Sequence, residues 1–192
     1  MKKDFPGTLF LVVGNSGSGK DSIISGVINK YPSNLRKIYL VKRFITRTSS
    51  ETEKNYSITP EEFKKLELKG SFALKWHIYG LDYGIPIEIE DWLKNGNPVI
   101  VNVSRTIINK TREIYANLKV IFIEVPFEIT LHRLKKRGRE SEELLNERIE
   151  RAKTHQKLPD ADFIVDNSGD LDYAIDQFLN YIVSFEKENQ NQ

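Results

Sequence analysis

A glycine-rich segment near the start of the chain constrains its fold more than any other feature. It reads Gly14-Asn15-Ser16-Gly17-Ser18-Gly19-Lys20-Asp21-Ser22 and fits the spacing G-x-x-x-x-G-K. Glycines allow a tight loop whose N–H groups point at phosphate oxygens, and the helix that follows adds the positive end of its dipole. Lys20 can then bridge the β and γ phosphates of ATP. The segment predicts a nucleotide-binding loop.

The sequence on either side of this loop supports the prediction. Residues 8–13 form an apolar run of strand length, and residues 21–30 place Ile23, Ile24 and Val27 at helical spacing. Strand, glycine loop and helix therefore follow one another in the order that a phosphate-binding loop needs. A glycine-rich turn without a ligand is the alternative.

Further short apolar runs are typical of buried parallel strands. They lie at residues 38–41, 99–103, 120–125 and 163–165. Together with residues 8–13 they predict an α/β protein with the P-loop NTPase fold, in which helices flank a five-stranded, mostly parallel sheet. An apolar stripe from Leu171 to Ile182 predicts a long final helix.

The chain is expected to form one domain with an insertion. With 192 residues, 39% of them hydrophobic, it is long enough for one core but short for two. Within the insertion, Thr59-Pro60-Glu61-Glu62 reads as a helix capping box. The predicted parts are a core at about 1–42 and 91–186, an acceptor-binding insertion at about 43–90, a lid at about 133–151 and an unstructured tail at 187–192.

Composition narrows the classes of partner. The 29 basic and 27 acidic residues give a formal net charge of +2, so no overall field attracts nucleic acid or a membrane, and we predict neither as a partner. Cysteine is absent, so disulfides and thiolate chemistry are excluded. The start Met1-Lys2-Lys3 resembles that of a signal peptide, but Asp4 and Pro6 interrupt the pattern. No apolar run is long enough to cross a bilayer, so we predict a cytoplasmic location. The sequence leaves the oligomeric state open.

Basic residues gather in two further places. Arginines of the 133–151 segment predict a lid that brings guanidinium groups onto a transferring phosphoryl group, with Gly138 as the point where it bends. The predicted catalytic residues are Lys20, Arg133, Arg137 and Arg148. Arg43 and Arg47, with Tyr56 nearby, are candidates to hold an anionic acceptor. Ordinary solvated or salt-bridged surfaces are the alternatives in both places.

The residues just described resemble those of the guanylate kinase superfamily. Val41–Tyr56, Gly70–Ser104 and Leu131–Ala152 follow its order and spacing, so the similarity covers nearly the whole chain. Within the superfamily the chain is most similar to the ribose 1,5-bisphosphate phosphokinases. That similarity rests on Gly17 to Ser22, Ile45-Thr46-Arg47, Trp76-His77, Gly80-Leu81, Tyr83-Gly84 and Arg137-Gly138-Arg139-Glu140.

The resemblance implies a reaction. The γ-phosphoryl group of ATP would move to the small-molecule substrate ribose 1,5-bisphosphate, at its 1-phosphate, giving 5-phospho-α-D-ribose 1-diphosphate. In bacteria that carry such an enzyme, the resemblance implies that it serves phosphonate breakdown and can supply a precursor of NAD. A guanylate or other nucleoside monophosphate kinase is the alternative within the superfamily. A non-catalytic interaction module is the alternative of another class.

Departures from guanylate kinases favour the sugar phosphate. Those enzymes read guanine with carboxylates, whereas the matching positions here are Lys75, Asn102 and Ser104. Losing carboxylates leaves the N–H donors of guanine without charged partners, and a lysine favours a ligand with two phosphates. The family's second phosphate-binding arginine falls near Ser50, so Lys54 is a further candidate. The predicted acceptor-binding residues are Arg43, Arg47, Tyr56, Lys75, Tyr83, Asn102 and Ser104.

The expected chemistry needs a metal but no base. A phosphate monoester has a second pKa of about 6 and is already mostly ionised at neutral pH. Mg²⁺ is the expected cofactor, and Asp21 stands where a Ser or Thr hydroxyl usually meets it, so we predict that Asp21 contacts the ion directly or through water. Asp166-Asn167 resembles the family segment that lines the adenine pocket through backbone groups, with a plain turn as the alternative.

Overall fold

The structure, a computed structural model, divides the chain into two compact units. It describes residues 1–47, 55–137 and 141–190. The first unit is Met1–Phe10 with Lys37–Leu118, and the second is Leu11–Arg36 with Lys119–Gln192. The predicted insertion, residues 43–90, lies wholly within the first unit.

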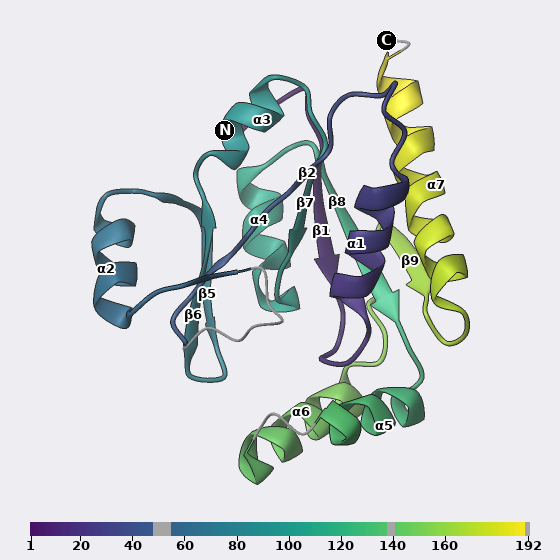
Figure 1. Ribbon diagram of the computed structural model, residues 1–192. Helices are drawn as coiled ribbons and strands as arrows, with labels where there is room; N and C mark the ends of the chain where they lie inside the picture. The colour runs from purple at the N-terminus through teal and green to yellow at the C-terminus, as the bar shows by residue number, and fades with distance from the viewer. Residues whose placement is uncertain (48–54, 138–140, 191–192) are drawn as a thin grey trace. The chain divides into compact units, whose positions relative to one another are not determined.

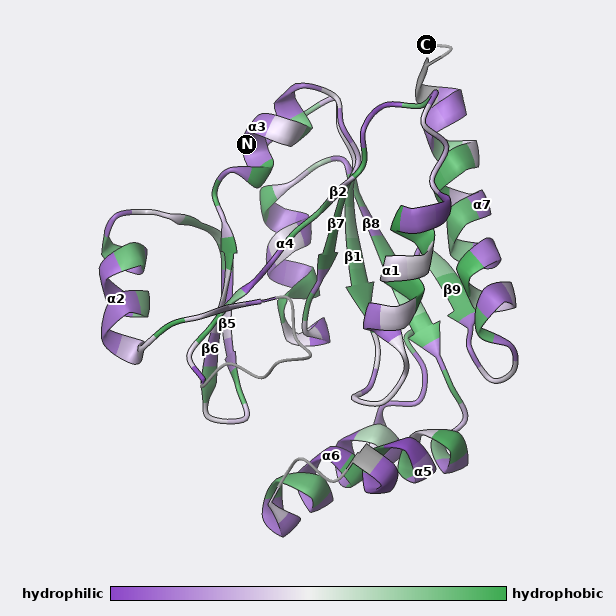
Figure 2. Ribbon diagram, viewed as in Figure 1, coloured by the Kyte–Doolittle hydropathy of each residue, from purple (hydrophilic) through white to green (hydrophobic). Residues whose placement is uncertain are grey.

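A five-stranded parallel sheet confirms the predicted fold class (Figure 1). Its strand order is β2-β7-β1-β8-β9. The strands are β1 (Leu9–Val13), β2 (Tyr39–Leu40), β7 (Val99–Asn102), β8 (Leu118–Glu124) and β9 (Phe163–Asp166). All five residues of β1 are buried, which explains why its sequence is continuously apolar instead of alternating. Figure 2 shows the hydrophobic character of β1 and β7.

In the second unit, helices follow strands as the sequence predicted. They are α1 (Lys20–Lys30), α5 (Phe127–Arg137), α6 (Glu142–Thr154) and α7 (Leu171–Gln190). Helix α1 packs closely on α7, because a Cβ added to Gly26 would lie 2.2 Å from Cδ1 of Ile175. Helix α7 continues through residues 187–190, so the prediction of an unstructured tail is wrong there. Residues 191–192 lie outside the described part.

The first unit contains a second sheet that the sequence analysis did not anticipate. Its strand order is β4-β3-β6-β5. The strands are β3 (Phe44–Ile45), β4 (Tyr56–Ser57), β5 (Phe72–Ile78) and β6 (Leu81–Pro86). The helices of this unit are α2 (Pro60–Leu68), α3 (Ile89–Lys94), the 3-10 helix η1 (Arg105–Ile107) and α4 (Ile108–Ile114).

The predicted capping box at the start of α2 is confirmed. The Thr59 side chain accepts a hydrogen bond from the Glu62 N–H, and the Glu62 side chain accepts one from the Thr59 N–H. Proline at the first helical position costs nothing there, because that N–H has no partner within the helix.

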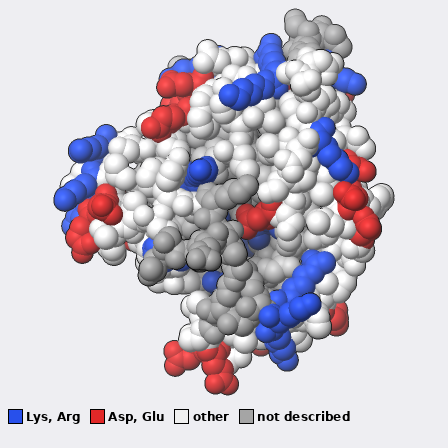
Figure 3. Space-filling view, viewed as in Figure 1, with Lys and Arg blue, Asp and Glu red and all other residues white. Residues whose placement is uncertain are grey.

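On the face shown in Figure 3, the described residues carry charges of both signs. Such a mixture is what the small net charge leads one to expect. Among helices of the described residues, none combines the length and apolar character needed to cross a bilayer.

Candidate active site

The glycine loop forms a turn between β1 and α1, with Lys20 folded over it. The Lys20 ammonium Nζ donates to the carbonyl oxygens of Gly14 at 2.9 Å and Asn15 at 3.0 Å, and it lies 3.4 Å from Ser18 Oγ. The Ser18 N–H also donates to the Asn15 carbonyl at 3.1 Å. These contacts hold the lysine charge at the loop, where it can meet phosphate oxygens.

The loop needs its glycines for two separate reasons. Gly17 and Gly19 both have φ of 85°, a left-handed conformation that favours glycine. At Gly14 the reason is close packing, since a Cβ there would lie 2.9 Å from the carbonyl oxygen of Ile123 on β8. The loop backbone is therefore held close to the sheet, and its shape depends on residues without side chains.

Arginines of the predicted lid reach the loop. Arg148 of α6 donates from Nη1 to Ser16 Oγ at 3.0 Å. The Arg133 guanidinium of α5 lies near Gly19, its Nη1 3.9 Å from where a Cβ on that glycine would stand. Together with Lys20, the structure thus brings three of the four predicted catalytic residues to one loop. The side chain of Arg137 and residues 138–140, including Gly138 and Arg139, lie outside the described part.

The end of α6 is also tied to the loop, by a residue whose role the sequence did not reveal. The Asn15 amide Nδ2 donates to the carbonyl oxygen of His155 at 3.0 Å, with a longer contact to that of Ala152 at 3.4 Å. These carbonyls lie at the C-terminal end of α6, where helix carbonyls have no partner within the helix. Asn15 thus satisfies groups that the helix leaves open.

The surroundings of Asp21 are compatible with Mg²⁺. Asp21 and Ser22 are exposed in the first turn of α1, and the described residues contain no group of three His, Cys, Asp or Glu side chains that could hold a metal alone. Mg²⁺ in kinases is usually bound by one or two protein oxygens together with substrate phosphates and water. A carboxylate beside a hydroxyl provides such oxygens, and the role of Asp21 stays a prediction.

In the first unit, Arg43 and Tyr83 of the predicted acceptor set lie together. The Arg43 guanidinium sits 5.8 Å from the centre of the Tyr83 ring, and its Nη1 donates to the Asn102 carbonyl oxygen at 3.2 Å. Tyr83 stacks on Trp76, with ring centres 5.1 Å apart. Both residues are more than nine-tenths buried, since Tyr83 is 8% and Trp76 is 9% exposed. A cation is therefore fixed above a rigid aromatic pair.

In the four-stranded sheet, Lys75 and Tyr56 lie on the face opposite to that of Trp76 and Tyr83. Successive residues of a strand point to opposite faces, so Lys75 is turned away from the face of Trp76. Lys75 forms an ion pair with Glu67 of α2, and the Tyr56 ring contacts that of Phe44 at 4.9 Å. The structure thus divides the predicted acceptor residues between two faces.

The other predicted acceptor residues lie at or near the ends of strands and helices. Ser104 caps η1, because its Oγ accepts from the N–H and hydroxyl of Thr106 at 3.3 and 2.9 Å. Asn102 ends β7 and is 7% exposed, and Arg47 follows β3. Ser50 and Lys54 fall outside the described residues, so the second phosphate-binding position stays open.

The sequence matches a known protein family and curated relatives over most of its length. The family model described as guanylate kinase matches residues 7–184, so the chain belongs to the guanylate kinase family. A ribose 1,5-bisphosphate phosphokinase (PhnN) of Bradyrhizobium diazoefficiens is 36% identical over 177 residues, which are 92% of this chain and 88% of that protein. The protein of the same name from Pseudomonas paraeruginosa is 38% identical over 178 residues, covering 92% and 95%. The chain is therefore a kinase.

Solved structures agree on the fold. A guanylate kinase from Anaplasma phagocytophilum superposes with a TM-score of 0.66 at 19% identity, covering 97% of this chain and 89% of that one. An unliganded sugar kinase from Janibacter gives 0.53 at 19% identity, covering 93% and 95%. At such identities the likeness concerns the fold alone.

Proposed function

We propose that this kinase transfers the γ-phosphoryl group of ATP to the 1-phosphate of ribose 1,5-bisphosphate. An oxygen of that phosphate attacks the γ-phosphorus while the bond to the β–γ bridging oxygen breaks, giving 5-phospho-α-D-ribose 1-diphosphate and ADP. The observation that carries the proposal is the coverage of nearly the whole chain by relatives named ribose 1,5-bisphosphate phosphokinase. Guanylate kinase family membership alone would leave the acceptor open.

The acceptor chemistry fits the residues of the first unit. A sugar bisphosphate offers two dianions, and the Arg43 guanidinium above Tyr83 is a cation that can pair with one of them. The positions at which guanylate kinases carry acidic side chains hold Lys75, Asn102 and Ser104, which offer the N–H groups of guanine no carboxylate acceptor. No catalytic base is required, because the attacking phosphate is already ionised at neutral pH.

Catalysis then consists of positioning and charge stabilisation. We assign phosphate binding to the loop N–H groups and Lys20, and stabilisation of the transferring group to Arg133, Arg137 and Arg148. Mg²⁺ would offset the charge on the triphosphate, with Asp21 and Ser22 as its protein contacts. A cytoplasmic location, where ATP is available, completes the proposal.

One assay tests the acceptor. ADP release is measured with ATP and Mg²⁺ in the presence of ribose 1,5-bisphosphate, of GMP, and with neither. We expect release with the sugar bisphosphate alone, and formation of 5-phospho-α-D-ribose 1-diphosphate in equal amount. Faster turnover with GMP would replace the proposal by guanylate kinase activity, and silence with every acceptor would contradict it.

A further inference from the structure

The turn after β9 carries a buried amide that contacts the glycine loop. Asn167 is 2% exposed, and its Nδ2 donates to the carbonyl oxygen of Ser18 at 2.8 Å. A Cβ on Gly19 would lie only 2.5 Å from the same nitrogen. The amide is thus packed directly against the peptide that joins Ser18 to Gly19, between segments 149 positions apart in the chain.

The backbone around Asn167 is itself held in place. Its N–H donates to the Glu124 carbonyl of β8 at 2.9 Å. The Ser168 N–H donates to Asp166 Oδ1 at 2.9 Å, which closes the turn. Gln177 of α7 accepts from the Asp166 N–H at 3.1 Å and donates to the Asp166 carbonyl at 3.0 Å, much as a neighbouring strand would.

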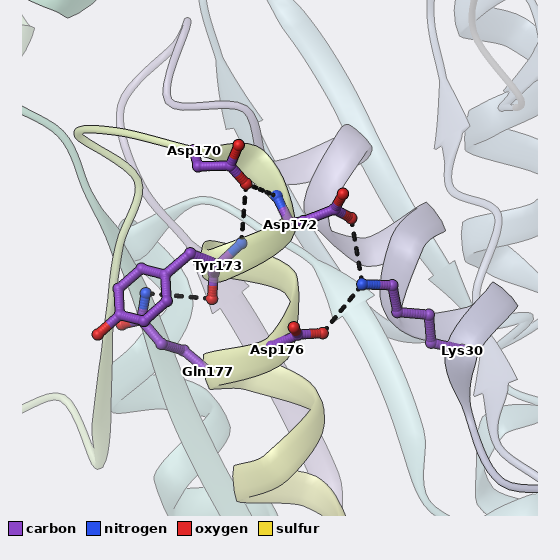
Figure 4. A network of polar contacts seen from close by, with 6 residues as sticks. All are labelled: Lys30, Asp170, Asp172, Tyr173, Asp176 and Gln177. Carbon is purple, nitrogen blue, oxygen red and sulfur yellow. Dashed lines mark hydrogen bonds and ion pairs between the residues drawn. The ribbon is translucent and has the colours of Figure 1, made fainter.

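The start of α7, which carries Gln177, is anchored in turn (Figure 4). Asp170 Oδ1 accepts from the N–H groups of Asp172 at 2.7 Å and Tyr173 at 3.2 Å, as a helix N-cap does. Lys30 of α1 lies 3.1 Å from Asp172 and 3.0 Å from Asp176. These ion pairs are exposed and contribute little, so the N-cap and Gln177 are the contacts that matter.

Holding one end of a peptide bond fixes the direction of the other. The described peptide bonds are all trans, so the C=O and the following N–H point to opposite sides. With the Ser18 carbonyl turned toward Asn167, the Gly19 N–H must point away from it.

We propose that Asn167 is a positioning residue for nucleotide binding, whose amide orients the Ser18–Gly19 peptide so that the Gly19 N–H faces the phosphates of ATP. The inference rests on the proposed use of ATP at this loop. It is independent of the acceptor. Asn167 acts through the loop backbone and makes its contribution without touching the nucleotide itself.

The test compares the triphosphate with the nucleoside. The affinities of ATP, inorganic tripolyphosphate and adenosine are measured by calorimetry or competition for the wild type and for Asn167→Ala, with thermal melting to confirm folding. We expect the Kd of ATP and of tripolyphosphate to rise about tenfold, as for one lost buried hydrogen bond, with adenosine unchanged. In turnover, the KM of ATP should rise while that of the acceptor stays constant.

Two further variants guard the interpretation. Asn167→Asp keeps the size of the side chain but turns the donor into an acceptor that repels the Ser18 carbonyl, and exposed Ser168→Asp adds the same charge one residue away. We expect a loss of tripolyphosphate affinity at least tenfold greater for the first than for the second. If Asn167→Ala does not fold, Gln177→Ala loosens the turn without touching the loop and should raise the same Kd by a smaller factor.

The outcomes separate the inference from the proposed function. If the wild type does not bind ATP, the proposed function and this inference both fail. If the wild type binds but the folded Asn167 variants keep tripolyphosphate affinity, the inference alone is overturned. A loss confined to adenosine would assign Asn167 to the base instead.

Discussion

The two units of this chain hold their charged and polar groups in different ways. Around the phosphate loop, buried or partly buried side chains from distant segments fix backbone atoms, as Asn167 does at Ser18 and Asn15 does at the end of α6. In the first unit, the predicted acceptor side chains are set by the face of a strand, so Arg43 lies with Tyr83 whereas Lys75 pairs with Glu67 on the other side.

We infer that this difference follows from the ligands proposed for each region. A triphosphate bound at such a loop is recognised mainly by backbone N–H groups, and their direction depends on the side chains that hold the loop backbone. An acceptor is recognised by side chains, and a side chain on the wrong face of a strand cannot reach it. Mutations at the loop should therefore change nucleotide binding or turnover in proportion to the contact removed, and effects in the first unit should depend on the face of the strand.

The largest effect is expected at Lys20. Lys20→Ala removes the charge that the Gly14 and Asn15 carbonyls hold over the loop, and kcat should fall on the order of 10²–10³-fold, as when one donor to a developing charge is lost. Lys30→Ala, at the far end of the same helix, is the control and should keep turnover. Steady-state kinetics with a melting curve for each variant measure both. Wild-type turnover in folded Lys20→Ala would rule out the assigned role.

The second prediction compares how the two faces of the four-stranded sheet contribute to acceptor binding. Arg43→Ala should raise the KM of the acceptor by about 10–100-fold, the value of a lost charge-assisted hydrogen bond, with the KM of ATP unchanged. Lys75→Ala is the matched control, because its ion pair with Glu67 is exposed and worth little. Initial rates at varied acceptor concentration measure both. A larger effect for Lys75→Ala would show that acceptor binding uses the opposite face.

A third prediction compares the buried carboxylates of the units, Glu90 and Glu186. Glu90 accepts hydrogen bonds from Lys3 at 2.5 Å and from Tyr115 at 2.8 Å. Burial raises the pKa of Glu186 to about 7, opposed by the charge of Arg36, and the nearby Tyr31 hydroxyl is buried without a hydrogen-bond partner in the described part of the chain.

The sign of the pH dependence follows from this raised pKa. Between the ordinary value of 4.5 and about 7, the folded state binds more protons at Glu186 than the unfolded state does, so the free energy of unfolding falls as pH rises through this window. Glu186→Gln should remove that fall and stabilise the protein at pH 8 by about 1–2 kcal/mol. Glu90→Gln should destabilise instead. Urea unfolding at pH 5 and pH 8 measures the free energy of unfolding of each variant. An equal pH dependence of this free energy in the wild type and in Glu186→Gln would contradict the raised pKa of Glu186.

Local sequence was enough for the strands of the five-stranded sheet, the glycine loop and the α2 capping box, because each is encoded within a few neighbouring residues. The Asn167 contact was not predictable, since it joins segments 149 positions apart and Asn after a strand is ordinary turn chemistry. The face of the strand on which Lys75 lies was predictable from the sequence. Leu74, Trp76 and Ile78 alternate with polar residues, a period-two pattern that indicates a strand and puts Lys75 opposite Trp76.

The smallest predicted effect concerns how the loop holds the arginine of α6. Ser16→Ala removes the oxygen to which Arg148 donates at 3.0 Å, but leaves the arginine and its charge in place. We expect kcat to fall about threefold to tenfold, the value of one hydrogen bond, with the KM of both substrates unchanged. Exposed Ser25→Ala on α1 is the control.

If Arg148 is placed by Ser16, then Arg148→Ala and the double variant of Ser16→Ala with Arg148→Ala should have equal turnover, because the serine acts only through the arginine. Additive losses would mean that Ser16 contacts the phosphates directly, and the loop would then rely on a side chain just as the acceptor region does.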